Sequence, residues 1–499
     1  MRRSPIAAFA LVGLVAASIL VGSARATETL SDRALRRSIV QVRISSSQYE
    51  YTRPWVRQAG RTYSVLGLVV PGNRILVRAS DVDRATLLEV TKYSSYEPVL
   101  ARVDIMDTEV NLALLQLESE DGFFTDLLPI PAGADPELGE TVTAYKVDQL
   151  FRGYRERVDV TEVDSVADYG FTFLPVMVFR TRESFPGGGI LLSGDRICGF
   201  ISYASRDNRV EAIPALGFDT FRRRALEQPY SGFVSQGLKL SELVDPVLRE
   251  YYRMPSGQHG AFVERVLPGT SAYGLLEAGD ILMAVDGVPV DDRGFYEDPA
   301  WGRQHANLLF ARRGTELRRP GDRLSVTVLR AGERRDVQLN LRAYAGTAER
   351  IPWDVDGQPP YLIENGMVFL ELSATLLLQA YGQDWRSKAP ELAYLFDTRR
   401  YYETPGADRI VILAGVLPGD HTRGYEQVGV MPVTQIAGRP VVNLEEMRRV
   451  LHAEAAAGHA TLAIRLSDGR SLHVDLANRD QVNREFLEQY GIPALSQWD

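Results

Sequence analysis

The stretch that most constrains the fold runs from residue 181 to residue 201. Three consecutive glycines, Gly187 to Gly189, are followed by an apolar run, the turn Ser193-Gly194-Asp195 and a second apolar run that ends at Ile201. Two short apolar runs joined by a glycine-containing turn predict a β-hairpin. Adjacent glycines let the chain turn sharply and bring backbone N–H groups close to a neighbour. The stretch therefore favours an antiparallel β-structure built around a glycine-rich loop.

The N-terminus has the pattern of an export signal. Arg2 and Arg3 precede an apolar stretch and the small-x-small sequence Ala24-Arg25-Ala26. This pattern predicts a signal peptide over residues 1–26, cleaved before Thr27. An uncleaved membrane anchor is the alternative, because the apolar stretch is close to the length of a membrane span. The whole chain of 499 residues is long enough for about three domains.

The cysteine content and the net charge limit the cellular compartments and the classes of binding partner that we expect for this chain. The single cysteine, Cys198, excludes an internal disulfide and is expected to be a buried apolar residue. An exported protein without disulfides fits a bacterial periplasm. The net charge of −9 is the wrong sign for nucleic-acid binding, and the isolated His259 has no partner that suggests a metal site. We expect protein or peptide partners, no nucleic acid, no metal and no cofactor.

Short β-branched runs recur between residues 38 and 203, separated by turns such as Pro71-Gly72-Asn73. Many short strands at this spacing predict an antiparallel sandwich or barrel. The specific arrangement that we expect over residues 27–228 is a pair of six-stranded barrels.

Three segments of this region match, in order, the motifs of one known protein family. Where the family pattern ends in T-N-x-H-V-V, Ser80 stands at the histidine. Where the family has D-L-A-L-L, Asn111 stands at the aspartate, and where it has G-N-S-G-G-P, Gly187 stands at the serine. In these motifs the region resembles the HtrA/Deg (Do-like) family of exported trypsin-like proteases. The resemblance implies a chymotrypsin-like double β-barrel with degenerate triad positions.

The residues at these positions cannot perform the chemistry of the family. That chemistry needs a nucleophile, an imidazole base and a carboxylate that orients the base. Ser80 is no base near neutral pH, Asn111 has no charge and Gly187 has no side chain. All six histidines stand at or after His259, so no other alignment restores one to the region. We therefore expect a pseudoprotease without catalytic residues.

Two nearby features do not change this prediction. Ser184 lies three residues before Gly187 but has no neighbouring histidine to activate it, and we interpret it as a loop residue. Lys92 and Lys146 are the only lysines before residue 230, and we interpret both as solvated surface charges. Phe185 replaces the glycine two positions before the nucleophile, which disfavours a working oxyanion hole.

Residues 229–345 resemble a PDZ domain, and the G-D-I-L pattern that begins at Gly279 is its core. PDZ domains bind an extended peptide by adding it as a strand to a sheet edge. The resemblance implies that the loop Ser235-Gln236-Gly237-Leu238 captures a C-terminal carboxylate. Leu238 and Leu240 would line the pocket for the last side chain of the ligand. The alternative is that Gly237 only interrupts a strand.

Residues 346–480 repeat the same plan, with a strand after Gly366 and a helix capped by Asn443. They resemble the divergent second PDZ domain of plant-type Deg proteins, which implies a role in assembly, although Gly366 is placed to shape a groove. Residues 481–499 are expected to form a C-terminal tail. The aromatic residues Tyr49, Tyr51 and Trp55 are expected either to pack subunits into trimers or to pack on their own barrel.

These patterns together predict a mainly β chain, a chymotrypsin-like double β-barrel followed by two α+β PDZ domains. We expect an exported, non-catalytic scaffold that captures polypeptide C-termini or unfolded segments. It would act as a homo-trimer or in association with an active protease that it regulates. The alternative is an active Do-type serine endopeptidase in periplasmic protein quality control, which the missing histidine opposes.

Overall fold

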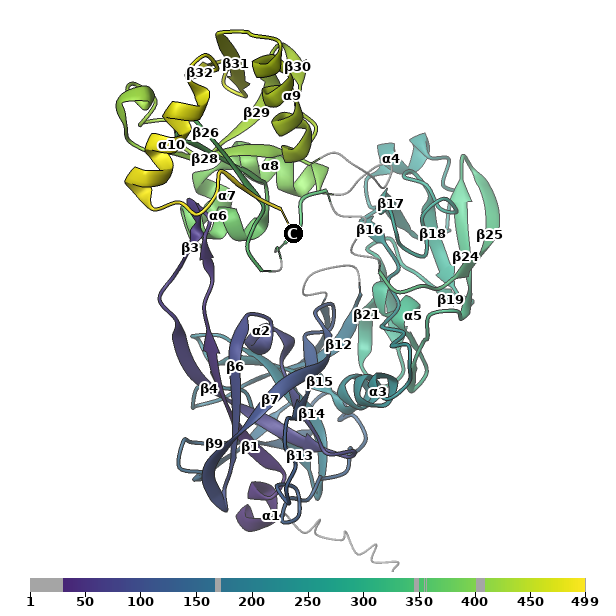
Figure 1. Ribbon diagram of the computed structural model, residues 1–499. Helices are drawn as coiled ribbons and strands as arrows, with labels where there is room; N and C mark the ends of the chain where they lie inside the picture. Colours follow the sequence, from purple (N-terminus) through teal and green to yellow (C-terminus); the bar gives the residue numbers. More distant parts are fainter. Residues whose placement is uncertain are drawn as a thin grey trace, which may run out of the picture.

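The computed structural model describes residues 30–166, 172–344, 350–353, 355, 357–400 and 409–498. The signal peptide predicted over residues 1–26 lies outside this part. Two β-units form the base of the molecule in Figure 1, and two α+β units lie above them. Within the described ranges no helix is long and apolar enough to cross a membrane.

The first β-unit is a closed barrel of six antiparallel strands. Their order around the barrel is β1 (Ile39–Ser46), β4 (Arg61–Val70), β5 (Arg74–Val77), β8 (Leu112–Leu117), β7 (Ser95–Asp107) and β6 (Ala85–Lys92). The interior is filled by β-branched and leucine side chains from all of the strands. A short helix, α1 (Asp32–Arg36), precedes the barrel, and α2 (Ala79–Val82) follows β5 directly.

The second β-unit is one sheet of seven strands, one more than expected. Their order is β10 (Gly153–Asp159), β9 (Thr141–Val147), β13 (Ile190–Ser193), β14 (Arg196–Ala204), β15 (Arg209–Pro214), β12 (Leu174–Arg180) and β11 (Glu162–Val166). The sheet curls until β10 and β12 lie in contact. The glycine-rich loop leads into β13 and β14, which pair as the predicted hairpin.

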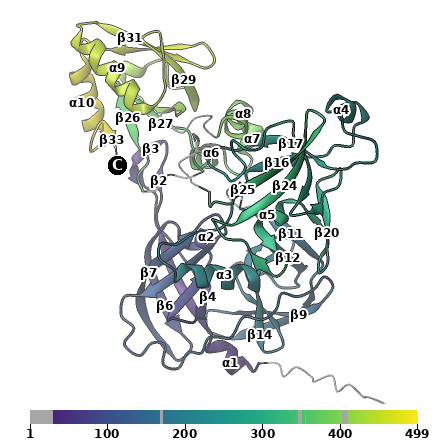
Figure 2. The same cartoon turned by 90° about the vertical axis from the view of Figure 1, so that its right-hand side faces the viewer.

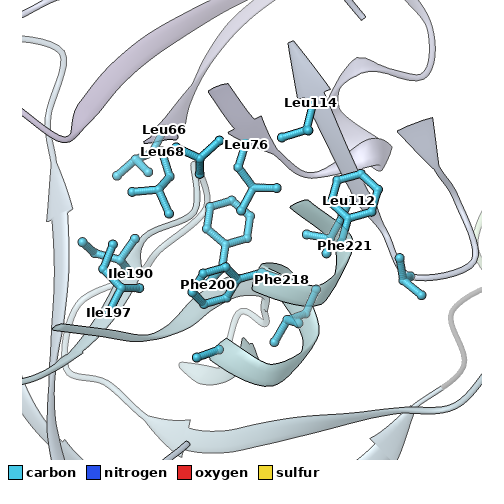
Figure 3. Packing of buried hydrophobic residues seen from close by; sticks show 14 of the residues in the cluster. Leu66, Leu68, Leu76, Leu112, Leu114, Ile190, Ile197, Phe200, Phe218 and Phe221 are labelled. Atoms are coloured by element: carbon cyan, nitrogen blue, oxygen red, sulfur yellow. The ribbon is translucent and has the colours of Figure 1, made fainter. Parts of the chain in front are cut away.

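One continuous core joins the two β-units to the helix α3 (Ala215–Ala225) (Figure 3). Leu66, Leu76 and Leu112 enter it from the barrel, and Phe200 enters it from the sheet. Phe221 of α3 closes it. Because both units share this core, the cleft between them has fixed walls.

The third unit is a five-strand antiparallel path with two short helices. The path runs β16 (Leu238–Ser241), β17 (Ala261–Val266), β18 (Ile281–Val285), β24 (Arg323–Arg330) and β25 (Glu333–Asn340), with β19 (Val288–Pro289) beside β18, and the helices are α4 (Pro246–Tyr251) and α5 (Asn307–Ala311). An inserted hairpin, β20 (Phe295–Asp298) and β21 (Gly302–His305), carries Trp301 at its tip. Trp301 is 3% exposed and packs into the core of the second β-unit. The hairpin therefore fastens the third unit to the sheet.

The fourth unit is built on a longer sheet. Its order is β32 (Ser471–Asp475), β31 (Thr461–Leu466), β29 (Met431–Ile436), β28 (Val411–Val416), β27 (Met367–Glu371), β26 (Tyr361–Glu364) and β33 (Ser496–Gln497), with β30 (Arg439–Pro440) beside β29. The helices are α6 (Ala374–Tyr381), α7 (Trp385–Lys388), α8 (Pro390–Arg399), α9 (Leu444–Ala456) and α10 (Arg479–Tyr490). The Asn443 side chain accepts a hydrogen bond from the Glu446 N–H and so caps α9.

Residues 481–499, expected to form a tail, are instead built into this unit as far as they are described. Val482 and Phe486 of α10 are buried in its core, and β33 pairs with β26. The reason is apolar burial, since the two side chains lie four residues apart on one face of the helix.

A two-stranded arm, β2 (Tyr49–Glu50) and β3 (Arg53–Arg57), rises from the first barrel and meets the fourth unit (Figures 1 and 2). Tyr51 at its tip is 5% exposed and belongs to the core cluster of that unit. The Gln379 side chain on α6 accepts from the Tyr51 N–H and donates to the Tyr49 carbonyl, both at 3.0 Å. The expectation that Tyr51 packs on its own barrel is therefore wrong. The described contacts of Tyr51 are with a surface that lies more than 300 residues away in the sequence.

Candidate functional site

The structure places Ser80 and Asn111 side by side at the cleft between the two β-units. Ser80 lies in α2, where β5 ends, and Asn111 stands immediately before β8. The Ser80 N–H donates a 2.8 Å hydrogen bond to Oδ1 of Asn111. Both residues line a cavity of about 400 Å³. The positions aligned with a catalytic histidine and aspartate thus meet, and hold a serine and an amide.

Gly187 lies on the other side of this cleft, in the glycine-rich loop. Its carbonyl accepts a 2.8 Å hydrogen bond from the Leu66 N–H of the barrel. It lines a second cavity, also of about 400 Å³. A residue without a side chain offers no nucleophile at this point.

Arg78 bridges the cleft, and the sequence analysis did not single it out. Its guanidinium donates to both carboxylate oxygens of Asp81, at 2.6 and 2.9 Å. It also reaches the carbonyl oxygens of Pro186, at 3.1 Å, and Ser202, at 3.5 Å, on the second unit. The side chain is only 11% exposed. An extended peptide that enters here must displace a paired, buried guanidinium, which costs free energy.

The charges around Arg78 reinforce this bridge. Burial raises the pKa of Asp81, and the neighbouring Arg78 partly offsets the rise. The Tyr63 hydroxyl donates to the Asp81 carbonyl at 2.7 Å, which fixes the segment that follows Ser80. In the T-N-x-H pattern that this segment resembles, an asparagine stands at the position of Arg78. The replacement of this asparagine by Arg78 is the sequence signal from which the bridge could have been predicted.

Ser184 and Lys146 come together beside the glycine-rich loop, where Lys146 contacts the main chain of Ser184. The Lys146 ammonium donates to the main-chain carbonyl of Ser184 at 2.5 Å. It also lies over the rings of Tyr154 and Phe185, at 4.9 and 4.8 Å. The Lys146 ammonium is in contact with a carbonyl oxygen and two ring faces. Lys146 is thus not the freely solvated charge that the sequence suggested.

The backbone of the glycine-rich loop is turned onto itself. Phe185 is fully buried, and Pro186 has no N–H to offer. The Gly188 N–H donates to the Phe185 carbonyl at 3.1 Å. An oxyanion hole requires free N–H groups that converge on one point. The N–H of Gly188 is already hydrogen-bonded within the loop and is not available to an oxyanion.

In the third unit, the loop predicted to capture a carboxylate lies at the start of the edge strand β16. Ser235, Gln236 and Leu238 are buried, and Leu240 packs partly against the core. Gly237 has a φ of +76°, and a Cβ there would overlap the Thr270 side chain. The close approach of the Thr270 side chain to the backbone therefore requires glycine at position 237. Within the described residues, β16 pairs with β17 alone and has one edge without a strand.

The equivalent edge in the fourth unit is filled by the chain itself. Strand β27, which follows Gly366, pairs with β26 on one side and with β28 on the other. The Asn365 N–H donates to Oδ1 of Asn483 on α10 at 2.7 Å. A Cβ at Gly366 would overlap the ring of Phe486. Gly366 therefore accommodates α10 and shapes no open groove in this structure.

Across the residues that the structure describes, no group of three or more His, Cys, Asp or Glu side chains is placed to hold an ion. Burial raises the pKa of the Cys198 thiol to about 12, so its nucleophilic thiolate is disfavoured.

The fold and these sites define a mainly β protein with a PDZ domain in its C-terminal region. Residues 352–497 match the family model described as a PDZ domain. The chain is similar to two proteases of Arabidopsis thaliana. Its identity is 24% to the chloroplastic protease Do-like 2, over 93% of this chain and 75% of that protein, and 22% to the mitochondrial protease Do-like 4, over 93% and 85%.

Two solved structures of proteases align with part of this chain. The HtrA-type protease AlgW with decapeptide aligns with a TM-score of 0.45 at 16% identity, over 63% of this chain and 100% of that one. The serine endoprotease from Yersinia pestis aligns with a TM-score of 0.40 at 16% identity, over 63% and 98%.

Proposed function

We propose that this chain is a catalytically inactive relative of the HtrA/Do-like proteases that binds polypeptide C-termini or unfolded protein segments. The observation that carries the proposal is the pairing of Ser80 with Asn111 across from Gly187. Together these positions contain no base near neutral pH and no carboxylate, so no group among them activates the Ser80 hydroxyl, and Gly187 has no side chain. The Arg78 bridge supports the same conclusion, because it occupies the cleft between the units.

Peptide binding is assigned in this proposal to the open edge of β16. An edge strand offers N–H and C=O groups to an added strand. Ser235, Gln236, Gly237, Leu238 and Leu240 line this edge or its start. Two further observations support the assignment of peptide binding to β16. In the fourth unit, both edges of the corresponding strand β27 are already paired, and Trp301 attaches the third unit rigidly to the second β-unit. We further propose that the chain acts in the periplasm after removal of residues 1–26.

The binding test uses the mature chain, residues 27–499, and a panel of fluorescein-labelled decapeptides that end in each of the twenty residues. We expect fluorescence polarisation to rise for peptides with a free carboxylate and not for the same peptides amidated. A Leu240→Asp variant should lose this signal, because a carboxylate would then stand beside the ligand. Equal binding of acid and amide forms would contradict C-terminal recognition.

A second candidate is an active Do-type endopeptidase, which the similarity to proteases favours. The two candidates differ in one observable, the cleavage of protein substrates by the purified chain.

Co-purification with an active protease would favour a regulatory subunit, and a homo-trimer measured by light scattering would favour a self-contained scaffold.

A further inference from the structure

The side chain of Gln236 lies on the peptide edge of β16. It is 2% exposed and folds back over the strand that follows it. Its Oε1 accepts from the N–H of Leu238, and its Nε2 donates to the carbonyl of Leu238, both at 3.3 Å. One carboxamide thus satisfies both backbone groups of a single strand residue.

The strand register shows that these two backbone groups are the ones that a ligand would use. The Gly237 carbonyl accepts from the Leu267 N–H at 2.8 Å and so points toward β17. Leu238 is opposite Val266 in the same antiparallel ladder. Successive residues of a strand alternate the direction of their N–H and C=O groups. Leu238 therefore directs both groups to the open edge, where Gln236 meets them.

The same carboxamide is also hydrogen-bonded to the helix α5. Gln236 Nε2 donates a 2.6 Å hydrogen bond to Oδ1 of Asn307, the first residue of α5. Asn307 is itself 7% exposed, and its N–H donates to Nδ1 of His305 at 3.3 Å. Gln236 therefore connects the edge strand to the helix α5.

We propose that Gln236 is an internal plug of the β16 peptide site. This inference rests on the proposed peptide binding. The primary amide of Gln236 reproduces the paired N–H and C=O of a peptide unit at the first position of the edge. A ligand binds only when this side chain rotates out. The group then released, the Leu238 N–H, is a donor that suits the free α-carboxylate of a peptide.

Removal of the plug is expected to strengthen binding. In Gln236→Ala the Leu238 N–H stays without its internal acceptor until a ligand supplies one. Since the ligand no longer competes with three internal hydrogen bonds, we expect the dissociation constant for free-carboxylate peptides to fall about tenfold or more. Asn307→Ala removes one anchor of the plug and keeps the other two bonds, so we expect a smaller gain.

The experiment measures polarisation of the labelled decapeptide panel with the mature full-length chain and its variants. Gln338→Ala is the matched control, because Gln338 is an exposed glutamine on β25 of the same sheet. Circular dichroism checks that each variant is folded, and Asn307→Ala keeps the test valid if Gln236→Ala does not fold. The supporting result is tighter binding in the order Gln236→Ala, Asn307→Ala, then the unaltered chain, with no gain for amidated peptides.

Two results would overturn the inference. They differ in whether the proposed peptide binding fails together with the plug. If the unaltered chain binds free-carboxylate peptides and folded Gln236→Ala binds them no better, the plug is refuted and the proposed peptide binding stands. If neither the unaltered chain nor the two groove variants bind any member of the panel, both the plug and the proposed function fail.

Discussion

Asp135 provides a test of how the second β-unit and α3 are held together. The first N–H groups of a helix have no partner inside the helix. Pro214, at the start of α3, supplies no side-chain cap. Oδ1 of Asp135, 81 residues earlier in the chain, accepts from the Leu216 N–H at 3.0 Å instead. Burial raises the pKa of Asp135 to about 6, and its hydrogen bonds and Arg312 only partly offset that rise.

The sign of the pH effect follows from this shift. Because the folded state holds the proton of Asp135 more tightly than the unfolded state, ionisation of Asp135 destabilises the fold. This cost is absent below the unfolded pKa near 4, grows as the pH rises to about 6 and is complete above that value. A shift of about two pKa units corresponds to about 3 kcal/mol. Since the carboxyl is only half-buried, solvent screening reduces our expectation to about 1–2 kcal/mol.

The perturbation is Asp135→Asn, which keeps an oxygen acceptor for Leu216 and removes the charge. We expect the variant to be more stable than the unaltered chain by about 1–2 kcal/mol at pH 7.5 and equally stable at pH 4. The assay is urea unfolding read by hydrogen exchange of peptides from α3, which separates this unit from the others. Glu137→Gln, at an exposed position of the same segment, controls for net charge. A variant that is less stable at pH 7.5, or a difference that does not change with pH, would refute the reasoning.

Three further substitutions test the contacts between units and the peptide loop. Tyr51→Ala should release the arm from α6, at a cost of about 3 kcal/mol for a buried aromatic side chain, and hydrogen exchange in α6 should rise. Trp301→Ala should cost a similar amount and loosen the third unit from the second, seen as a larger radius of gyration in X-ray scattering. Gly237→Ala should lower the urea midpoint of the third unit by overlap with Thr270.

Each of these has a control in the same element. Arg57→Ala changes an exposed residue of the arm, Arg303→Ala changes an exposed residue beside Trp301, and Gly257→Ala changes a positive-φ glycine with open space around it. If Tyr51→Ala leaves exchange in α6 unchanged, the arm does not hold the fourth unit. Unchanged scattering from Trp301→Ala would likewise remove the role of the inserted hairpin. A Gly237→Ala midpoint equal to that of Gly257→Ala would reduce the effect to backbone strain alone.

Local patterns were sufficient for the fold class. The mainly β character and the PDZ domain in the C-terminal region are confirmed. Strand alternation and glycine turns act over a few residues, so they can be read from neighbouring positions. The motifs around Ser80, Asn111 and Gly187 also lie at a strand end or in a loop, positions that are set locally in the fold.

The contacts that control access to the sites could not be predicted in this way. The arm meets Gln379, and nothing near Tyr51 in sequence indicates which distant surface it covers. The Arg78 bridge depends on main-chain carbonyls, which every sequence has. The plug formed by Gln236 depends on one rotamer and on Asn307, 71 residues away. For α10 a local signal was present in the four-residue spacing of Val482 and Phe486, but residues 481–499 were expected to form a tail.

The absence of catalysis is the central claim, and one assay tests it most directly. Purified mature chain is incubated with casein and with fluorogenic peptides, beside an active HtrA-type protease as positive control and a Ser184→Ala variant of this chain. The account predicts that the folded chain and its variant both leave every substrate uncut at the level of buffer alone. Turnover by the unaltered chain that persists through repurification would contradict the account, and its loss in Ser184→Ala would identify Ser184 as a nucleophile.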